Sequence, residues 1–332
     1  MENRKKDHIE LALTSRTGGI EKDNRFDYEP MLAPHPNNIS HETDFLGFKL
    51  KVPLWVSSMT GGTKMAGIIN RNLARACNEF GMGMGLGSCR IIMEDDTYFE
   101  DFNVKNIIGN EYPLFANLGI AQVELLIKEK ATGKIPDLLG KLRADGLVVH
   151  VNPMQEWVQP EGDRLGMPPL EVIERLTNLV DTKIIVKEVG QGMGPDSLHQ
   201  LLQLNIDAIE FAAFGGTNFA KVELERSSDM QKEMYLPFTK IGNTAEEMLL
   251  TVNGLASIKR DYHCRNLIIS GGIKNFLDGY YYINRSKIPA IYGQASAFLK
   301  YARDDYDRLR EYVSYQIQGL SLAKAYLKVK EE

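Results

Sequence analysis

The sequence has few cysteines and no long apolar run, and both absences narrow what the protein can be. Its three cysteines, Cys77, Cys89 and Cys264, are scattered and form no CxxC pair. A disulfide framework or a zinc site is therefore not expected, and a reducing cytoplasm is the expected location. No apolar run approaches the length of a membrane span. Residues 1–7 carry charges with no apolar stretch behind them, so no secretory signal is expected.

An excess of positive charge is also missing. The net charge is -5, so nucleic acid is not an expected partner, although local basic pockets for small anions stay compatible with it. The 332 residues are 43% hydrophobic and 25% charged. These values are typical of an ordinary globular protein, and the length fits one or two domains.

Eight short apolar runs, each followed by polar residues or glycine, recur from residue 50 onward. They cover residues 52–58, 81–87, 113–116, 147–149, 183–186, 208–212, 267–269 and 290–292. Helical patterns alternate with them, for example over residues 65–80, and such alternation indicates parallel βα units. Eight units of this length predict an α/β protein, a single (β/α)8 TIM barrel. A doubly wound sheet is the alternative, but no GxGxxG follows the first strand.

The remaining segments set the expected domain organisation. Residues 1–49 are expected to form an N-terminal arm and an irregular segment, with residues 14–44 free of regular structure, and residues 50–332 form the barrel. The charged stretch 221–262 predicts an insertion between strands 6 and 7, ending in a helix near residues 244–259. The alternating glycines of residues 81–87 weaken a strand, which indicates that something bulky packs closely against them.

A dense polar segment follows the fourth strand, from His150 to Arg164. It contains Asn152, Gln155 and Glu156 and is stiffened by two prolines. Sites in (β/α)8 barrels are built from loops at the carboxyl ends of the strands, so this predicted loop is a candidate site. The alternative is a solvated surface loop with a satisfied histidine at the strand exit.

Glycine turns follow the last three strands. Residues 215–217, 270–274 and 293–296 contain them, and glycine lets backbone N–H groups approach a phosphate closely. A phosphorylated cofactor held there would reach across the barrel. Asn117 is then placed to hydrogen-bond a heterocycle, and Lys187 to stabilise negative charge on it. For Lys187 an ion pair with a neighbouring acid is the alternative.

With these motifs assembled, the chain resembles the type 2 isopentenyl-diphosphate isomerases, flavoproteins with a (β/α)8 barrel. The resemblance covers residues 4–299 and is most specific in the segment after the fourth strand combined with the Met–Thr–Gly–Gly turn. The matching stretches are Arg4–Lys5 with His8, and residues 58–62, 87–90, 115–119, 150–156, 158–163, 185–190, 215–217 and 270–273.

The resemblance implies interconversion of isopentenyl diphosphate and dimethylallyl diphosphate with reduced FMN and Mg²⁺, NADPH only priming the flavin. It also implies a homo-oligomer, a tetramer or octamer. The implied catalytic residues are His150, Gln155, Glu156 and Lys187, with Glu156 as the metal ligand. The implied substrate-binding residues are Arg4, Lys5, His8, Ser88, Arg90, His150, Asn152 and Gln155. The implied FMN contacts are Met59, Thr60, Gly61, Ser88, Asn117, Lys187, Thr217, Gly271, Gly272, Ile273, Lys274, Ala295 and Ser296.

The sequence departs from the family pattern at Cys89, at residues 191–194, at residues 213–214, and around Ala295, where Gln294 and residues 296–297 differ. The last two departures touch the expected phosphate end. Two other classes stay open. An FMN-dependent 2-hydroxy-acid oxidase needs a histidine and an arginine late in the barrel, but the late His263 precedes the seventh strand. A non-catalytic barrel that binds a phosphorylated ligand is the third class.

Overall fold

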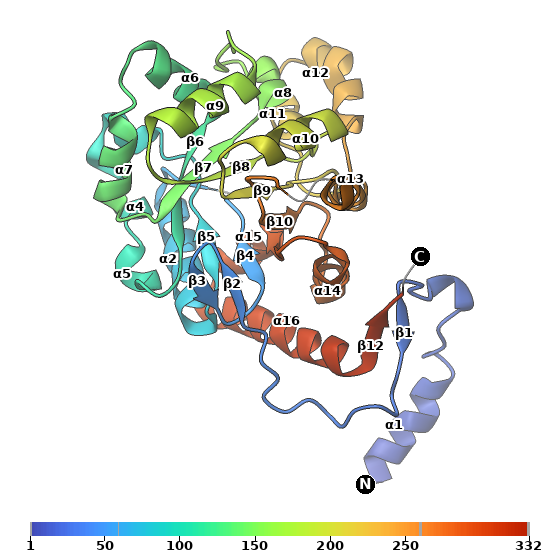
Figure 1. Ribbon diagram of the computed structural model, residues 1–332. Coiled ribbons are helices and arrows are strands. Elements are labelled where there is room, and N and C mark those ends of the chain that lie inside the picture. The colour runs from blue at the N-terminus through green and yellow to red at the C-terminus, as the bar shows by residue number, and fades with distance from the viewer. Residues whose placement is uncertain (1, 59, 259–260, 331–332) are drawn as a thin grey trace.

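A closed barrel of eight parallel strands forms the centre of the molecule (Figure 1). The computed structural model describes residues 2–58, 60–258 and 261–330. Pairing of the last barrel strand with the first closes the barrel, which confirms the (β/α)8 prediction and excludes the open doubly wound sheet. The barrel strands are β4 (Leu54–Val56), β5 (Gly83–Gly85), β6 (Leu114–Gly119), β7 (Gly146–His150), β8 (Lys183–Lys187), β9 (Ala208–Glu210), β10 (Leu267–Ser270) and β11 (Ala290–Gln294).

Helices surround the strands, as the alternation in the sequence predicts. The longer ones are α2 (Lys64–Phe80), α6 (Ile120–Lys128), α7 (Lys134–Leu142), α9 (Pro169–Leu179), α10 (Pro195–Gln203), α13 (Ala245–Ile258), α14 (Phe276–Arg285) and α16 (Tyr306–Tyr326). Shorter ones lie in the loops: α3 (Ile91–Glu94), η2 (Asp96–Tyr98), α4 (Phe99–Phe102), α5 (Lys105–Ile108), α8 (Pro153–Val158) and α15 (Ser296–Ala302). In α2 the Thr63 side chain caps the first turn by accepting the Ala66 N–H.

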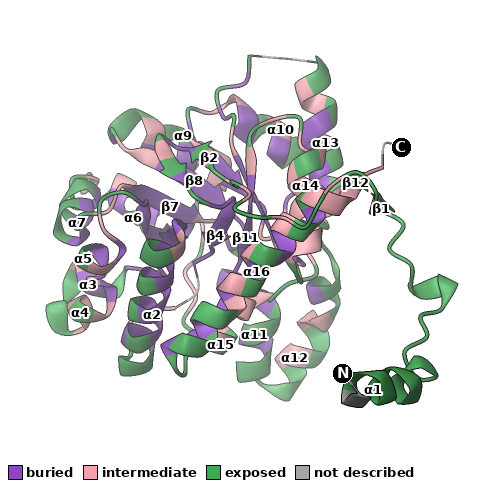
Figure 2. Cartoon of the chain, turned by 90° about the horizontal axis from the view of Figure 1, so that it is seen from below, coloured by how far each residue is buried: buried purple, intermediate pink, exposed green. Residues whose placement is uncertain are grey.

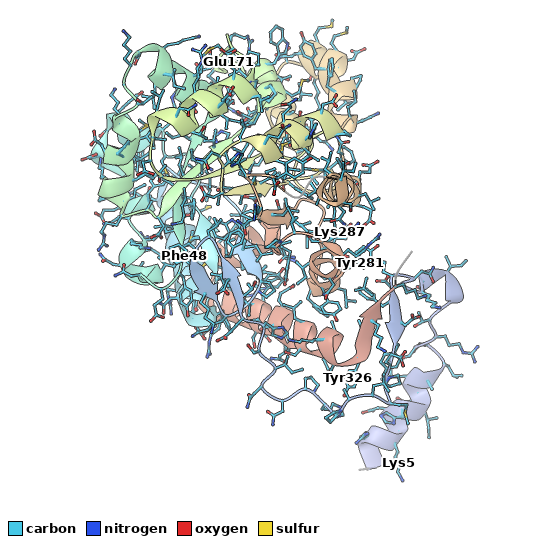
Figure 3. The ribbon with its side chains drawn as sticks, viewed as in Figure 1. Lys5, Phe48, Glu171, Tyr281, Lys287 and Tyr326 are labelled. Carbon is cyan, nitrogen blue, oxygen red and sulfur yellow. The ribbon has the colours of Figure 1, made fainter. Side chains whose placement is uncertain are left out.

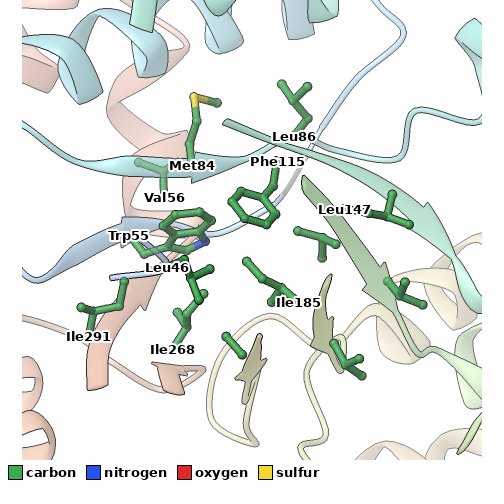
Figure 4. Packing of buried hydrophobic residues seen from close by; sticks show 14 of the residues in the cluster. Leu46, Trp55, Val56, Met84, Leu86, Phe115, Leu147, Ile185, Ile268 and Ile291 are labelled. Atoms are coloured by element: carbon green, nitrogen blue, oxygen red, sulfur yellow. The ribbon is translucent and has the colours of Figure 1, made fainter. Parts of the chain in front are cut away.

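A hairpin closes the end of the barrel at which the strands begin. Strands β2 (Thr43–Phe45) and β3 (Phe48–Leu50) pair antiparallel through Leu46 and Gly47, both at positive φ. Two such residues are typical of a tight two-residue hairpin turn. Phe45 and Leu46 are buried, and the Phe45 ring lies 5.9 Å from that of Trp55. Leu46 lies close to Trp55 among the apolar side chains of the barrel (Figure 4). The hairpin therefore belongs to the core, although the sequence placed most of it in the arm.

The glycine-rich strand β5 packs against Trp55, which confirms the expected bulky neighbour. A Cβ atom on Gly83 would lie 2.3 Å from the Trp55 ring. Trp55 is fully buried and also meets Phe115 edge to face, with ring centroids 5.9 Å apart. The missing side chain in β5 thus makes room for the largest side chain of β4.

The N-terminal arm extends away from the barrel and is exposed along most of its length (Figure 2). It contains α1 (Glu2–Ala12), the single turn η1 (Gly19–Glu21) and β1 (Phe26–Tyr28). Strand β1 pairs antiparallel with β12 (Leu327–Val329), which follows α16. The expectation that residues 14–44 lack regular structure is therefore wrong at η1, at β1 and at the start of β2. The division into an arm (1–49) and a barrel (50–332) stays our proposal for the domain organisation.

The insertion between the sixth and seventh barrel strands is present as predicted. It forms α11 (Phe219–Arg226), α12 (Asp229–Tyr235) and η3 (Leu236–Lys240) before α13 begins. Ala220 and Leu224 of α11 form a small apolar cluster with Val158 of α8. The Gln231 side chain donates to the Val158 carbonyl at 2.8 Å. The insertion therefore supports the short helix that follows β7.

Phe45→Ala should lower the free energy of unfolding by about 3–5 kcal/mol, because it empties a buried aromatic site in the core. Urea unfolding followed by circular dichroism measures the change. Met31→Ala, at a residue that is 90% exposed, is the control and should change stability by no more than about 0.5 kcal/mol. Equal stability of the two variants would show that the hairpin contributes nothing to the core.

Candidate active site

A cavity of about 400 Å³ lies at the carboxyl ends of the barrel strands. This is where (β/α)8 barrels carry their sites, and the volume is in the range of small-molecule pockets. Its lining includes Ser57, Ser58, Lys187, Gly190, Glu210, Ala212, Gly215, Gly216, Thr217, Phe219, Ser270, Gly271, Gly272, Ile273, Lys274, Gln294, Ala295, Ser296 and Lys300. All three glycine turns singled out from the sequence meet in this one cavity.

The turns after β9 and β10 lie directly against each other. Gly271 and Gly272 have φ values of +84° and +74°, which favour glycine. A Cβ on Gly271 would come within 2.1 Å of the Ala213 nitrogen, and one on Gly216 within 3.2 Å of the Gly271 Cα. The close approach of the two backbones leaves main-chain groups rather than side chains to face the cavity.

Two of the family departures lie at this end and are integrated into the structure. Gln294 is buried, donates to the Ile273 carbonyl and accepts the Tyr312 hydroxyl proton at 2.8 Å. Phe214 donates its backbone N–H to the Asn243 carbonyl at 2.8 Å. Gln294 thereby links the turn after β10 to α16, so the departures do not open this end of the cavity.

Lys187 lies at the end of β8, 95% buried, and lines the cavity. Its ammonium donates to the Glu188 carbonyl oxygen at 2.8 Å rather than to a carboxylate. The Glu188 carboxylate points elsewhere and accepts the N–H groups of Gly190, Gln191 and Gly192. The alternative of an ion pair for Lys187 is therefore not what the structure shows.

Asn117 and His150 form a hydrogen-bonded pair on neighbouring strands. The Asn117 amide donates to the Leu86 carbonyl at 3.0 Å, so its oxygen accepts the Nδ1 proton of His150 at 2.7 Å. Burial first, and then the charge of Lys187, lower the pKa of His150 to about 3. His150 is therefore neutral at physiological pH, with its Nε2 as an acceptor.

Helix α8 holds the acid–amide group that follows β7. The polar composition predicted a loop here, but Pro153 at the first helical position starts a helix. Glu156 is buried; its two carboxylate oxygens accept the Asn152 amide at 3.0 Å and the Asp163 N–H at 2.8 Å. The Asn152 amide also donates to Gln155 at 3.2 Å. These bonds fix the Glu156 carboxylate before any ligand arrives.

Arg90 lies on the same rim. It forms an ion pair with Asp163 at 2.9 Å, and the Gln122 amide donates to the same carboxylate oxygen at 3.2 Å. Arg90 is exposed, and so is Ser88, two residues before it. The pair connects the loop after β5 to the segment after α8, where Arg164 donates to the Glu156 carbonyl at 2.7 Å. The rim therefore contains two guanidinium groups together with the fixed Glu156 carboxylate.

The structure brings most predicted residues together and leaves three apart. Lys187, Thr217, Gly271, Gly272, Ile273, Lys274, Ala295 and Ser296 line the cavity. Thr60 and Gly61 follow β4, where a Cβ on Gly87 would meet the Thr60 carbonyl at 2.3 Å. Arg4, Lys5 and His8 lie exposed on α1, which projects away from the barrel (Figure 1). Lys5 is labelled in Figure 3 and lies far from the barrel. Met59 lies outside the described residues.

The sequence reasoning missed Glu210, Ser57 and Ser58 as cavity residues. Glu210 has 0% exposure, and one of its carboxylate oxygens has no hydrogen-bond partner. The hydroxyls of Ser57 and Ser58 are likewise buried without a partner. An acid inside the apolar run Ala208–Ala212 was the available indication. Unpartnered buried polar atoms in a cavity wall indicate that a polar ligand completes them.

The described residues contain no group of three or more His, Cys, Asp or Glu side chains arranged to hold a metal ion. Across the same residues, no helix combines the length and apolar character that a membrane crossing requires.

Solved structures with the same fold are flavoenzyme barrels. A flavocytochrome b2 variant with sulfite bound matches with a TM-score of 0.62 and 13% identity, over 91% of this chain and 72% of that one. A mandelate oxidase mutant with an FMN adduct matches with a TM-score of 0.57 and 13% identity, over 92% and 88%. At such identities the match shows the fold, which defines a (β/α)8 barrel protein with its site at the carboxyl ends of the strands.

Curated relatives then define the family, although no family model matches the chain. The isopentenyl-diphosphate delta-isomerase of Rickettsia felis is 32% identical over 96% of this chain and 90% of its own length. Those of Nostoc sp. and Vibrio parahaemolyticus are 35% and 34% identical, over 83% and 89% of this chain and 78% and 84% of their own lengths. The chain belongs to the isopentenyl-diphosphate delta-isomerase family, and its barrel fits the type 2 members, which confirms the resemblance.

The lowered pKa of His150 predicts an acid-sensitive contribution to stability. The unfolded chain, with an ordinary histidine pKa of about 6.5, binds a proton that the folded site rejects down to a pH of about 3. Stability is therefore lost as the pH falls through about 6.5. Urea unfolding between about pH 7 and pH 4.5 should show a steeper loss for the wild type than for His150→Gln. Equal slopes, or an imidazole NMR titration near pH 6.5, would contradict the assignment.

Proposed function

We propose that the protein interconverts isopentenyl diphosphate and dimethylallyl diphosphate, using reduced FMN and Mg²⁺. The observation that carries the proposal is the row formed by His150 and Lys187, direct partners in the β7–β8 register. Lys187 lines the cavity with the glycine turns. The Nε2 of His150 and the Gln122 side chain both lie over Gly119, and Gln122 binds Asp163, the ion-pair partner of Arg90. A cofactor cavity and an anion-binding rim thus share one edge. Family membership supports the same activity.

The residues of the cavity fit FMN. The unpartnered hydroxyls of Ser57 and Ser58 suit a polar ligand, and the glycine turns suit its phosphate. Gly272, Ile273, Ala295 and Ser296 would offer backbone donors to the phosphate. Lys274 would contribute its ammonium, because its N–H already donates to Asp278 at 2.8 Å. Thr60, Gly61, Ser88, Asn117 and Thr217, with Met59, stay proposed contacts.

The rim residues suit a diphosphate with Mg²⁺. Arg90 supplies a cation, and the fixed Glu156 carboxylate is a hard oxygen ligand for Mg²⁺, which needs few protein groups when phosphates are present. The negative charge of a bound diphosphate would raise the pKa of His150 and make Nε2 a donor to it. Asn152 and Gln155 would add amide donors. The substrate is thereby oriented by side chains that are largely fixed beforehand.

The chemistry needs a strong acid and a base at carbon, which none of these side chains provides. Reduced FMN, when bound, supplies that acid–base chemistry without net oxidation. The part of Lys187 is to hold positive charge in the cavity and so favour the anionic reduced cofactor. We further propose NADPH as the primer of the reduced state and a reducing cytoplasm as the location, which the three buried free cysteines support.

An oxidase with the fold of the flavoenzyme neighbours is the second candidate. Such an enzyme requires a histidine base and an arginine late in the barrel. His263 is exposed and precedes β10, at the opposite end of the strand from the cavity. The residues around the cavity therefore favour the isomerase over the oxidase.

The isomerase should be inactive on isopentenyl diphosphate while its FMN is oxidised. Reduction with dithionite under anaerobic conditions, with Mg²⁺, should start many turnovers per reductant equivalent, because substrate and product have the same oxidation level. In D₂O the product should gain deuterium. One product per reductant equivalent would indicate an oxidoreductase, and tight flavin binding without any turnover would indicate the non-catalytic barrel.

The arm bearing Arg4, Lys5 and His8 is proposed to complete the site of a neighbouring subunit in a tetramer or octamer. In the structure α1 projects away from its own barrel (Figure 1). Ile9 and Leu13 are 75% and 73% exposed, which suits packing against another copy. The site of one chain would then depend on the arm of the next.

Deletion of residues 1–8 should leave a folded, yellow protein whose KM for the diphosphate rises by about 10- to 100-fold, from loss of charge-assisted contacts.

The Glu156→Gln variant should lose the response of its activity to Mg²⁺ and still bind FMN. If the arm acts on a neighbour, co-expression of the two variants should restore Mg²⁺-dependent activity with a low KM, which neither variant has alone. If each arm serves its own subunit, the mixture keeps the raised KM. An unchanged KM in the deletion variant would remove the arm from the site altogether.

A further inference from the structure

Glu210 is an acid buried in the floor of the cavity with half of its carboxylate unsatisfied. It ends β9 with 0% exposure. One oxygen accepts the Ser270 hydroxyl at 3.1 Å, and Ser270 in turn accepts the Ala212 N–H at 2.9 Å. The other oxygen has no partner, although it is buried. The protein satisfies one half of this group and leaves the other half, in a residue of the cavity lining, without a donor.

Burial of a carboxylate oxygen without a donor is unfavourable, so such a group in a cavity wall indicates a ligand that donates to it. Lys187, the direct register partner of Glu210 in β8, does not fill this role, because no donor lies within hydrogen-bond distance of that oxygen. The missing partner must therefore carry an O–H or N–H group and reach the floor between β8 and β10.

The position of β9 narrows the choice of donor. The glycine turns that suit the phosphate follow β10 and β11, whereas Lys187 and Asn117, which suit the ring, lie on β8 and β6. A chain that runs from the phosphate turn after β10 to Lys187 on β8 passes β9, which lies between these two strands in the barrel order. In FMN that chain is a sugar alcohol with three hydroxyl donors.

We propose that the Glu210 carboxylate accepts a hydrogen bond from a hydroxyl of the ribityl chain of FMN and so positions the flavin relative to Lys187. The inference rests on the proposed FMN site. Glu210 is a positioning residue: it fixes the chain between phosphate and ring and takes no part in proton transfer to the substrate. Its unsatisfied oxygen is a cost to the flavin-free fold that the cofactor removes.

Binding of three flavins tests the assignment. Lumiflavin has the ring alone, riboflavin adds the ribityl chain, and FMN adds the phosphate. Dissociation constants are measured by fluorescence quenching on the flavin-free full-length protein. Glu210→Ala should weaken FMN and riboflavin by the same factor, about 10- to 100-fold, and leave lumiflavin unchanged. Glu210→Gln should show a smaller loss. The matched control Lys274→Ala should weaken FMN alone.

Thermal unfolding of the flavin-free protein separates this role from a structural one. Glu210→Gln keeps the Ser270 contact and removes the buried charge, so its Tm should equal or exceed that of the wild type. A lower Tm would show that the carboxylate stabilises the fold. An equal loss of lumiflavin affinity would show that Glu210 contacts the flavin ring and not the ribityl chain. Either result, or unchanged FMN affinity, overturns the inference. A wild type that binds no FMN would instead contradict the proposed function.

Discussion

The strand register of β7, β8 and β9 is the constraint on which the site depends. It places His150, Lys187 and Glu210 side by side in one row, although they are far apart in the sequence. Successive side chains of a strand point to opposite faces, so a slip of one residue in β8 or β9 would move Lys187 or Glu210 out of the cavity. The buried runs of apolar residues preceding them in each strand hold that register. The same residues that form the core thus determine the electrostatics of the cavity.

This row explains the charge state of His150. Burial first, and then the Lys187 ammonium, lower the pKa of His150 and keep it neutral, and Asn117 fixes which nitrogen carries its proton. Next to the row, α8 holds Glu156 through Asn152 and the Asp163 backbone. The insertion between β9 and β10 packs on α8 from outside. The insertion thus stabilises the rim, although it contributes no predicted contact to the diphosphate.

The sequence predicted the eight strands well because their apolar runs are short, are bounded by glycine or polar residues, and alternate with helical patterns. It failed where local and tertiary effects compete. The hairpin Thr43–Leu50 follows a polar, proline-containing stretch, and its Leu46 takes a positive φ that only core packing explains. The polar composition of α8 predicts a loop. Its polar side chains instead form hydrogen bonds with Asn152. Glu210 was overlooked inside an apolar run, and the position of the arm depends on contacts that no local pattern encodes.

The antiparallel pair of β1 and β12 has a consequence for how the two ends of the chain evolve. Strand β1 pairs with β12, and Phe26 of β1 packs against Tyr280 and Tyr281 of α14, so β12 and α14 together determine where the arm begins. From that anchor, residues 13–25 have a maximal reach of about 45 Å, which limits how far Arg4 and Lys5 can travel. Substitutions or deletions near residue 328, in β12, would thus change how far from the barrel Arg4 and Lys5 can reach. Substitutions in the N-terminal arm and in β12 should therefore be correlated.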